Sequence, residues 1–406
     1  MRNATAADGR DEAPPSGRDA APARWHGFDG LRAVIVVLGV GLHAAVPFLD
    51  LPVAGLPWAV RAGEPSALLT HFFWWFHAVQ IPLFFLLAGF FAAHTVGRDG
   101  PATFLRHRLR RLLLPLLAAA AVLLPITFYV YAAGWWLAGD CTWNEIRRVK
   151  FAPPLQAELF GPAHLWFLEY LVLYCLLYWS YRAWRPQPRP ARGALWLPLA
   201  TAAIIAVDPG VYTAHHNRFV PIASVFLHQG VFFAAGAWLH AQRHRLRGDA
   251  RIAAAAAIVA LPLFAVVEAL TRRQLATPLG LAGRILFALA LALLIWTTIA
   301  GAIAAALRWG DRPSPRLRYV AAASYWIYLL HLPLLVALQL ALVRLPLPPL
   351  VGWSVAVALT TAVCLWTYGR WVRGTALGVW LDGDRRAPAP AAMPAAWPAG
   401  AADAPG

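Results

Sequence analysis

The chain has 406 residues, of which 60% are hydrophobic and only 13% are charged, and its mean hydropathy is +0.56. A soluble protein carries roughly a quarter of its residues as charged side chains, so much of this surface must face lipid. The net charge of +16 does not indicate a nucleic-acid-binding protein, because the arginines form clusters between apolar runs rather than one basic face. The composition excludes a soluble enzyme and favours an integral membrane protein.

The two ends of the chain differ from its middle. Residues 1–25 are rich in Ala, Pro, Asp and Arg and contain no apolar run long enough for a signal peptide. The last residues are mostly Ala, Pro and Gly, and neither end can bury enough apolar surface to fold. We therefore expect disordered cytoplasmic tails at residues 1–25 and 376–406, on either side of a transmembrane domain at 26–375.

Ten apolar runs lie between these tails. A helix needs about 20 apolar residues to cross the hydrocarbon, and the runs are at residues 30–50, 78–97, 109–132, 164–182, 194–207, 219–240, 252–270, 281–306, 318–342 and 348–369. The fifth is the weakest, because it is short and Pro198 and Asp208 lie close to its ends. The sequence predicts an all-α bundle of about ten transmembrane helices.

The basic residues predict the orientation of this bundle. If the N-terminus is cytoplasmic and the runs alternate, 25 of the 35 basic residues lie on the cytoplasmic side and 9 on the other, with Arg32 inside the first span. Cytoplasmic loops of membrane proteins carry such an excess of Lys and Arg. Without the fifth span, the later segments would have the opposite bias. We expect both ends in the cytoplasm and a multi-pass protein of the bacterial inner membrane.

The first span carries two ionisable residues on one face. Ten residues separate Arg32 from His43, and the eleven steps at about 100° each make three turns plus about 20° and about 16 Å along the axis. Arg32 then lies near the cytoplasmic mouth and His43 near mid-membrane, with Asp29 placed to cap the helix and pair with Arg32. The alternative is that the Arg32 side chain extends to the cytoplasmic lipid headgroups and that His43 forms a hydrogen bond between packed helices.

These residues resemble the signature of the membrane-bound acyltransferase 3 family, in which a basic residue, ten residues and a histidine lie in the first span. Four further motifs follow in order. His77–Phe91 is similar to the second span of the family, and basic residues follow between the second and third spans. The HLWFL segment begins at His164, and the segment from Ser324 to Pro333 resembles its late SxxiYlxHxp span. The four motifs contain His77-Ala78-Val79-Gln80-Ile81-Pro82-Leu83-Phe84-Phe85; Phe104, Arg108, Arg111 and Pro115; His164-Leu165-Trp166-Phe167-Leu168; and Tyr328 with His331.

The likeness covers nearly the whole membrane part and, within the family, is greatest to the glucan biosynthesis protein C branch. The chain departs at Ala88, where the family usually has Ser, and at His107, which lies among the arginines. The resemblance implies a cytoplasmic acyl-CoA donor, acetyl-CoA or succinyl-CoA, as co-substrate and no permanently bound cofactor. It also implies a saccharide or lipid-linked saccharide acceptor.

The chemistry of the residues fits acyl transfer. Transfer to a hydroxyl needs a base, and a buried neutral imidazole such as His43 suits this role. His43 either takes the acceptor proton or carries the acyl group as a covalent relay, and the sequence does not separate these routes. His43 and Arg32 are the candidate catalytic residues, with Arg32 as a cation that holds the donor. Arg108 and Arg111 are candidates, together with Arg32, to hold the CoA phosphates, because guanidinium groups bind phosphate bidentately. The alternative for Arg108 and Arg111 is a topological role at anionic lipid.

Other ionisable and aromatic residues are candidates for acceptor binding. We predict that His77 lies at the outer end of the second span beside an interfacial aromatic belt. Glu169 would lie deeper in the fourth span, where a free carboxylate needs a partner or a proton. The alternative role for Tyr328 and His331 is interhelical hydrogen bonding. His215 and His216 read as exposed loop histidines, and no metal site is expected. The candidate substrate-binding residues are His77, His164, Trp166, Glu169, Tyr328 and His331.

The leading hypothesis is an O-acyltransferase that modifies an exported or periplasmic saccharide such as a glucan, with the lipid bilayer, acyl-CoA and the acceptor as partners and no nucleic acid. The first alternative is a transporter or flippase of an envelope precursor that uses Arg32 and His43 as a substrate or proton pathway. A second alternative is a structural relative that binds without reacting.

Overall fold

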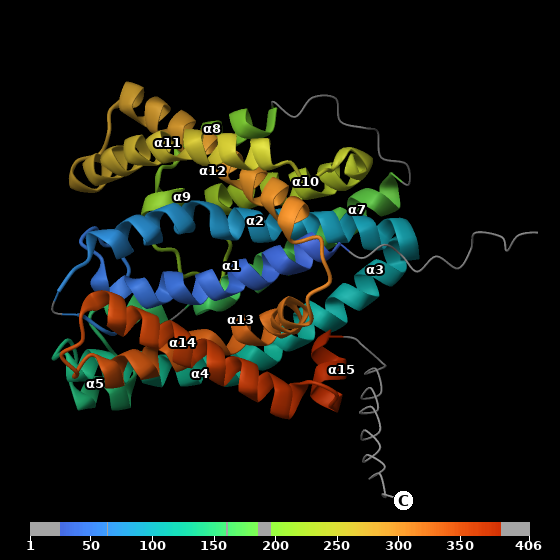
Figure 1. Cartoon of the computed structure of the whole chain (residues 1–406). Helices are drawn as coiled ribbons and strands as arrows, with labels where there is room; N and C mark the ends of the chain where they lie inside the picture. Colours follow the sequence, from blue (N-terminus) through green and yellow to red (C-terminus); the bar gives the residue numbers. More distant parts are fainter. Residues whose placement is uncertain (1–24, 63, 160, 186–195, 383–406) are drawn as a thin grey trace, which may run out of the picture.

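The structure is a computed structural model and describes residues 25–62, 64–159, 161–185 and 196–382. It is a bundle of long helices whose axes are roughly aligned (Figure 1). Within the described residues, the β pairing found is an isolated bridge between Ala54 and Ala214. The all-α prediction is confirmed.

Each of the ten predicted runs coincides with a helix. The main helices are α1 (His26–Ala45), α2 (Ala67–Asp99), α3 (Pro101–Arg108) continued through η2 (Leu109–Leu113) into α4 (Leu114–Leu137), α7 (Trp166–Trp184), α8 (Trp196–Val207), α10 (Ala223–Ala241), α11 (Ala250–Ala276), α12 (Leu281–Trp309), α13 (Pro315–Leu342) and α14 (Pro349–Thr367). Short elements join them: η1 (Val46–Phe48), α5 (Trp143–Arg148), α6 (Pro153–Leu159), η3 (Ala163–Leu165), α9 (Gly210–Thr213), η4 (Arg243–Arg245), η5 (Tyr368–Val372) and α15 (Ala376–Asp382).

Seven of these helical segments are long and apolar enough to cross a membrane, and an eighth is added if the 55° bend between α6 and the helix that ends at Trp184 lies within one span. α8 has 12 residues and rises about 18 Å, less than the hydrocarbon thickness of about 30 Å. α10 is not among the seven segments. The described residues thus form a multi-pass helical bundle, and the finer count of about ten spans stays a prediction.

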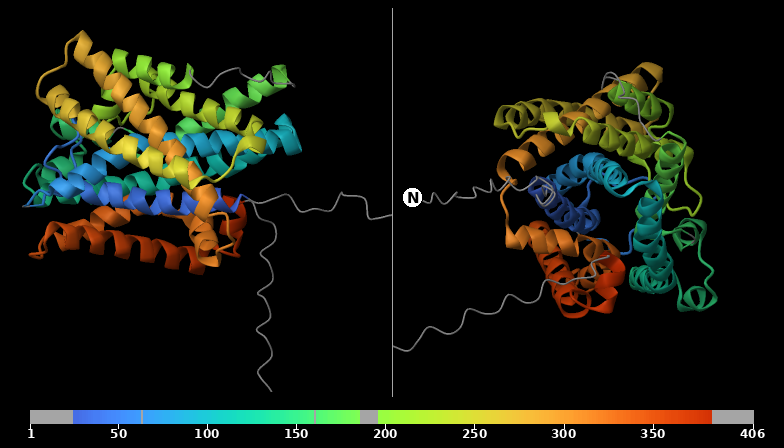
Figure 2. Two further views of the ribbon diagram at one scale, coloured as in Figure 1. Left: turned by 45° about the horizontal axis from the view of Figure 1, so that its top comes forward. Right: turned by 90° about the vertical axis from the view of Figure 1, so that its right-hand side faces the viewer.

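The first helix lies inside the bundle. The end-on view in Figure 2 shows α1 between α2, α11 and α12 on one side and α13 and α14 on the other. α1 contacts α2, α12, α13 and α14, and thirteen of its twenty residues are buried. The position explains how Arg32 and His43, on one face of α1, come to face the interior rather than lipid.

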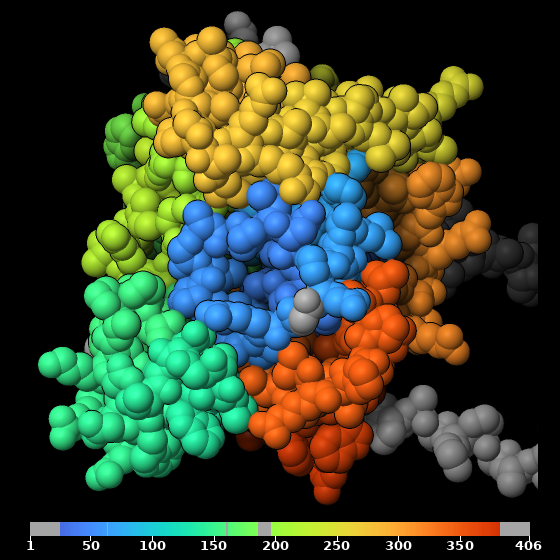
Figure 3. Space-filling view, turned by 90° about the vertical axis from the view of Figure 1, so that its left-hand side faces the viewer, coloured from blue at the N-terminus to red at the C-terminus, as the bar shows by residue number. Residues whose placement is uncertain are grey.

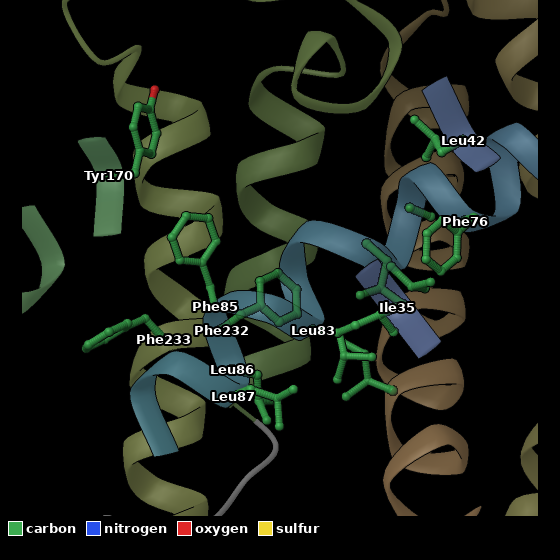
Figure 4. Packing of buried hydrophobic residues seen from close by; sticks show 14 of the residues in the cluster. Ile35, Leu42, Phe76, Leu83, Phe85, Leu86, Leu87, Tyr170, Phe232 and Phe233 are labelled. Carbon is green, nitrogen blue, oxygen red and sulfur yellow. The ribbon is translucent and has the colours of Figure 1, made fainter. Parts of the chain in front are cut away.

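The closest helix pair is α2 with α10, where two glycines allow the backbones to approach. A Cβ on Gly236 would meet the carbonyl oxygen of Leu86, and a Cβ on Gly89 would meet that of Phe233. Small residues at such crossings are the usual means of close helix packing in membranes. Beside this crossing, Phe85, Phe232 and Phe233 pack in the buried core (Figure 4). α2 and α10 therefore form one tightly fitted wall of the interior.

Two predictions about the ends of elements need correction. α1 begins at His26, after Trp25, which makes no side-chain cap; Asp29 therefore lies in the first turn and is not its cap. Residues Ala376–Asp382 form α15, whose Leu381 is 4% exposed, so the predicted tail from residue 376 begins too early. The first turn of α1 and α15 lie at the same end of the bundle (Figure 1). The predicted tails at residues 1–24 and 383–406 lie outside the described residues.

Candidate active site

A cavity of about 610 Å³ runs through the interior between α1, α2, α7, α10, α12 and α13. The cavity brings together most of the residues singled out from the sequence, although they come from segments far apart in the chain. Those that line it are Arg32, His43, His77, Arg108, Arg111, His164, Trp166, Tyr328 and His331. Asp29 and Glu169 are not among its lining residues.

Three histidines from three elements gather at one place in this cavity. The ring centroid of His331, on α13, lies 5.3 Å from that of His43 on α1. It also lies 5.4 Å from that of His164 on η3. The proximity of His331 to His43 follows from the packing of α13 against α1. The three imidazoles form one group, which we call the histidine cluster.

Hydrogen bonds orient two members of the histidine cluster. His331 donates from Nδ1 to the carbonyls of Ile327, at 3.1 Å, and Tyr328, at 2.8 Å. His164 donates from Nε2 to the carbonyl of Leu329 at 3.0 Å, and the Tyr328 hydroxyl donates to the His164 carbonyl at 2.7 Å. Because a carbonyl only accepts, these bonds assign the tautomers. Nε2 of His331 and Nδ1 of His164 then carry lone pairs.

His43 is held by stacking rather than by a hydrogen bond to the described residues. The Trp58 indole lies parallel to its ring, with centroids 6.0 Å apart and planes 4° apart. Trp58 donates from Nε1 to Oε1 of Gln339 at 3.1 Å, and Gln339 donates from Nε2 to the carbonyl of Ala44 at 3.1 Å. This chain of contacts returns to α1 one residue after His43. It fixes the ring while leaving its nitrogens accessible to a ligand.

The three arginines that the sequence analysis assigned to CoA binding line the same cavity. Arg32 donates to the carbonyl of Ala321 at 2.7 Å and to Oγ of Ser324 at 3.5 Å, and Asp29 lies 4.0 Å away. Arg108 lies over the Phe104 ring at 5.5 Å, and Arg111 belongs to the π-helical turn η2. Because guanidinium forks match phosphate geometry, these residues are suited to an anionic ligand.

The other end of the cavity has a mixed polar and aromatic lining. His215 and Glu158 lie 2.7 Å apart between Nε2 and Oε2, and Arg218, Tyr131 and Trp166 also line the cavity. The residues after α1 form the middle of this face of the molecule, which is hollowed there (Figure 3).

His215 and His216 are therefore not exposed loop histidines, as predicted, because both are partly buried and line the cavity. Burial lowers the pKa of His216 below its ordinary value, despite its hydrogen bond to the Gly210 carbonyl. Among the described residues, no group of three or more His, Cys, Asp or Glu side chains is placed to hold a metal ion.

Two other positional predictions are wrong. α2 begins at Ala67, so His77 lies three turns inside the helix, with Nε2 3.1 Å from the Tyr212 carbonyl. The predicted aromatic belt before it is partly core, because Phe73 is 2% and Trp74 0% exposed. Glu169, a candidate for acceptor binding, is not among the residues that line the cavity, and its buried Oε2 has no hydrogen-bond partner among the described residues.

Several lining residues were missed by the sequence analysis. Trp58 lies in an irregular loop whose path a pattern does not predict, and its partner Gln339 is a single polar residue in an apolar run. Gln80 follows His77 by three residues on α2, a helical spacing that signals a shared face. The missed residues include Trp58, Gln80, Tyr131, Glu158, Arg218, His228 and Gln229 on the cavity wall.

Fold and site together define a multi-pass helical membrane protein with a buried imidazole group and an arginine group in one internal cavity. Residues 25–369 match the acyltransferase domain family, and the chain belongs to this acyltransferase 3 family of enzymes. This confirms the resemblance read from the motifs.

Curated relatives carry the name glucans biosynthesis protein C. The chain is 25% identical over 235 residues to the protein of Salmonella gallinarum, covering 53% of this chain and 59% of that protein. It is 27% identical over 151 residues to the Escherichia coli SMS-3-5 protein, covering 37% of each. The chain thus matches less than two thirds of the length of these relatives. No solved structure matches it.

Proposed function

We propose that this protein is a membrane-embedded O-acyltransferase that moves an acetyl or succinyl group from cytoplasmic acyl-CoA to a hydroxyl of an exported or periplasmic saccharide such as a glucan. The observation that carries the proposal is the cavity shared by the three arginines and the histidine cluster. Family membership and the names of the two glucan-biosynthesis relatives support it.

The donor enters from the arginine end. Arg32, Arg108 and Arg111 would bind the CoA phosphates, and the thioester would extend toward His43. Arg32 and His43 are about 16 Å apart along α1. The cytoplasmic orientation of the arginine end rests on the distribution of basic residues, which places both ends of the chain inside. Reporter fusions test it: a fluorescent protein at either end is expected to fold in the cytoplasm, and alkaline phosphatase there is expected to be inactive.

His43 performs the chemistry by one of two routes. As a base, an imidazole nitrogen takes the hydroxyl proton while the acceptor oxygen forms a bond to the thioester carbon, and the carbon–sulfur bond then breaks. As a nucleophile, the imidazole first forms an acyl-imidazole and releases the CoA thiolate, and the hydroxyl then attacks that carbonyl. In both routes the thiolate takes a proton. Trapping of an acyl-histidine by rapid quench and mass spectrometry distinguishes them.

The acceptor binds at the opposite end, near the Glu158–His215 pair. Trp58, Trp166 and Tyr131 supply aromatic faces there, and aromatic faces beside hydrogen-bonding groups suit sugar rings. The acceptor hydroxyl would reach the histidine cluster from this side, so that donor and acceptor meet at His43 without sharing an entrance.

Membranes that contain wild-type protein or His43→Ala, supplied with labelled acetyl-CoA or succinyl-CoA and glucan acceptor, test the proposal. Wild type is expected to form acylated saccharide, and the variant to lose at least a hundredfold in rate while inserting normally. Unchanged transfer by His43→Ala contradicts the assigned role. Transport of an envelope precursor by wild type, lost in the variant and without any acylated product, would favour the transporter instead.

A further inference from the structure

Two neighbouring polar residues on α10 line the cavity without hydrogen-bond partners of their own. His228 is 4% exposed and both of its ring nitrogens lack a partner among the described residues; Gln229 is 6% exposed and its Oε1 lacks one. Both side chains line the cavity. A buried polar group without a partner destabilises the folded protein, so these groups are expected to meet a ligand there.

The surroundings of this pair select a neutral ligand group. The nearby cavity wall is apolar and includes Val225, Leu291 and Ile295, and Phe232 packs on the His228 ring at 5.2 Å. An ionised phosphate or carboxylate would lose its hydration in such a place without a matching charge. A neutral imidazole and a carboxamide each offer one or more donors and acceptors, which matches an amide group of a ligand.

The pair lies at a level between the arginine end and His43. His228 precedes Phe233, the residue in contact with Gly89, by five residues or about 7 Å. Phe84 lies the same five residues before Gly89 on α2, and Gln80 lies one helical turn before Phe84. Gln80 also lines the cavity and contacts Gly39, which lies about 10 Å beyond Arg32 and about 6 Å before His43 on α1.

The pantetheine arm of CoA fits this arrangement. It joins the phosphates to the thioester through about thirteen bonds of about 1.3 to 1.5 Å each and spans on the order of 16 Å when extended, similar to the Arg32–His43 separation. It carries two amide groups between these ends. We propose, on the basis of the proposed function, that His228 and Gln229, with Gln80, form the subsite that hydrogen-bonds the pantetheine amides.

No covalent bond forms or breaks at this subsite. Its role is to align the arm so that the thioester meets His43, which makes His228 and Gln229 binding residues rather than catalytic ones. The subsite would act on the part of the donor that acetyl-CoA and succinyl-CoA share, so it would not discriminate between these acyl groups.

The test measures binding of two probes to full-length protein purified in detergent. The first probe is CoA, and the second is adenosine 3′,5′-bisphosphate, which has nucleoside and phosphate groups but no pantetheine arm. The double variant His228→Leu/Gln229→Leu is expected to bind CoA about tenfold more weakly and the bisphosphate unchanged. His240→Leu, on the same helix but outside the cavity lining, is the matched control and is expected to change neither.

Two further measurements keep the test independent of misfolding. Without ligand, the double variant is expected to melt at or above the wild-type temperature, because leucine removes unpaired buried polar groups. His228→Gln keeps a neutral donor and acceptor and is expected to bind CoA within about threefold of wild type. The inference alone is overturned if the double variant binds both probes equally more weakly, or if it binds both with wild-type affinity. Failure of wild type to bind CoA at all overturns both the inference and the proposed acyl-CoA donor.

Discussion

The imidazole of His43 and the indole of Trp58 are parallel to within 4°, with centroids 6.0 Å apart. The stack joins a helix that crosses the interior to a loop that precedes α2, and Gln339 ties the loop to α13. Since His43 makes no hydrogen bond to the described residues, this stack is what sets the direction of its ring. A histidine that meets a donor from one side and an acceptor from the other needs such a fixed direction.

Removal of the stack is expected to slow transfer without weakening donor binding. Trp58→Leu deletes the indole, and Gln339→Leu deletes the amide that holds it. Both variants should lower kcat about ten- to a hundredfold, because a small misplacement of a reacting group costs about that much, with the donor KM within about twofold of wild type. Steady-state rates at varied acyl-CoA concentration in membranes provide the measurement.

Trp58→Phe and Trp184→Leu serve as controls for the stack. Phe keeps an aromatic face without the hydrogen bond and should fall between wild type and Trp58→Leu. Trp184 is 74% exposed at the end of α7, so its removal should leave kcat unchanged. A donor KM that rises in Trp58→Leu while kcat is constant would show that Trp58 binds the acyl-CoA donor rather than positions His43.

The arginines are expected to affect the donor rather than the chemistry. Arg108→Gln or Arg111→Gln removes a guanidinium that lines the cavity, and a hydrogen bond to a charged group is worth about 1.5 to 3 kcal/mol. Each change should raise the KM for acyl-CoA roughly ten- to a hundredfold and alter kcat less. Arg110→Gln is the matched control, because Arg110 is exposed, lies between them and does not line the cavity. An equal effect of all three changes would indicate a general role of positive charge at the membrane surface.

The α2–α10 crossing makes a prediction about stability. A methyl group at Gly236 would meet the backbone of α2 at the Leu86 carbonyl, which cannot move as a side chain can. Gly236→Ala should therefore lower the free energy of unfolding by about 1 to 3 kcal/mol, measured by thermal melting in detergent. Gly97→Ala, near the end of α2 and with nothing within 4 Å of the added carbon, should be neutral or slightly stabilising.

The sequence was informative wherever a regular helix sets the geometry. The 3.6-residue period places Arg32 and His43 on one face, and both line the cavity. It failed where irregular backbone or helix length decides the position: Trp58 reaches His43 through a loop, and His215 meets Glu158 across segments 57 residues apart. His77 was predicted at a helix end because α2 begins before its apolar run. Ser66 caps the start of α2 by accepting a hydrogen bond from the backbone N–H of Leu69. Glu169 shares α7 with Trp166, but only Trp166 is among the cavity-lining residues.

An ionic group outside the cavity fastens α11 to α2. Glu268, 8% exposed, lies 2.7 Å from Arg272 and 2.7 Å from His71, and Arg272 reaches Asp50 at 3.4 Å. Arg272→Gln leaves the buried Glu268 carboxylate with His71 alone and should lower the free energy of unfolding by about 1 to 3 kcal/mol. The loss is smaller than that for breaking a fully buried ion pair because Arg272 is part-exposed. Asp50→Asn should cost less than about 1 kcal/mol, because that pair is largely solvated.

The pH dependence of stability tests the contribution of the Asp50 carboxylate. Partial burial alone would raise the pKa of Asp50, but the Thr70 hydrogen bond and the Arg272 charge lower it below its ordinary value. A lowered folded-state pKa adds stability above the unfolded value of about 3.9 and loses it as pH falls through the folded value. The melting difference between wild type and Asp50→Asn should therefore be constant from pH 7 to 5 and shrink below about pH 4. A difference that already shrinks between pH 7 and 5 would contradict the assignment of this pH dependence to the Asp50 carboxylate.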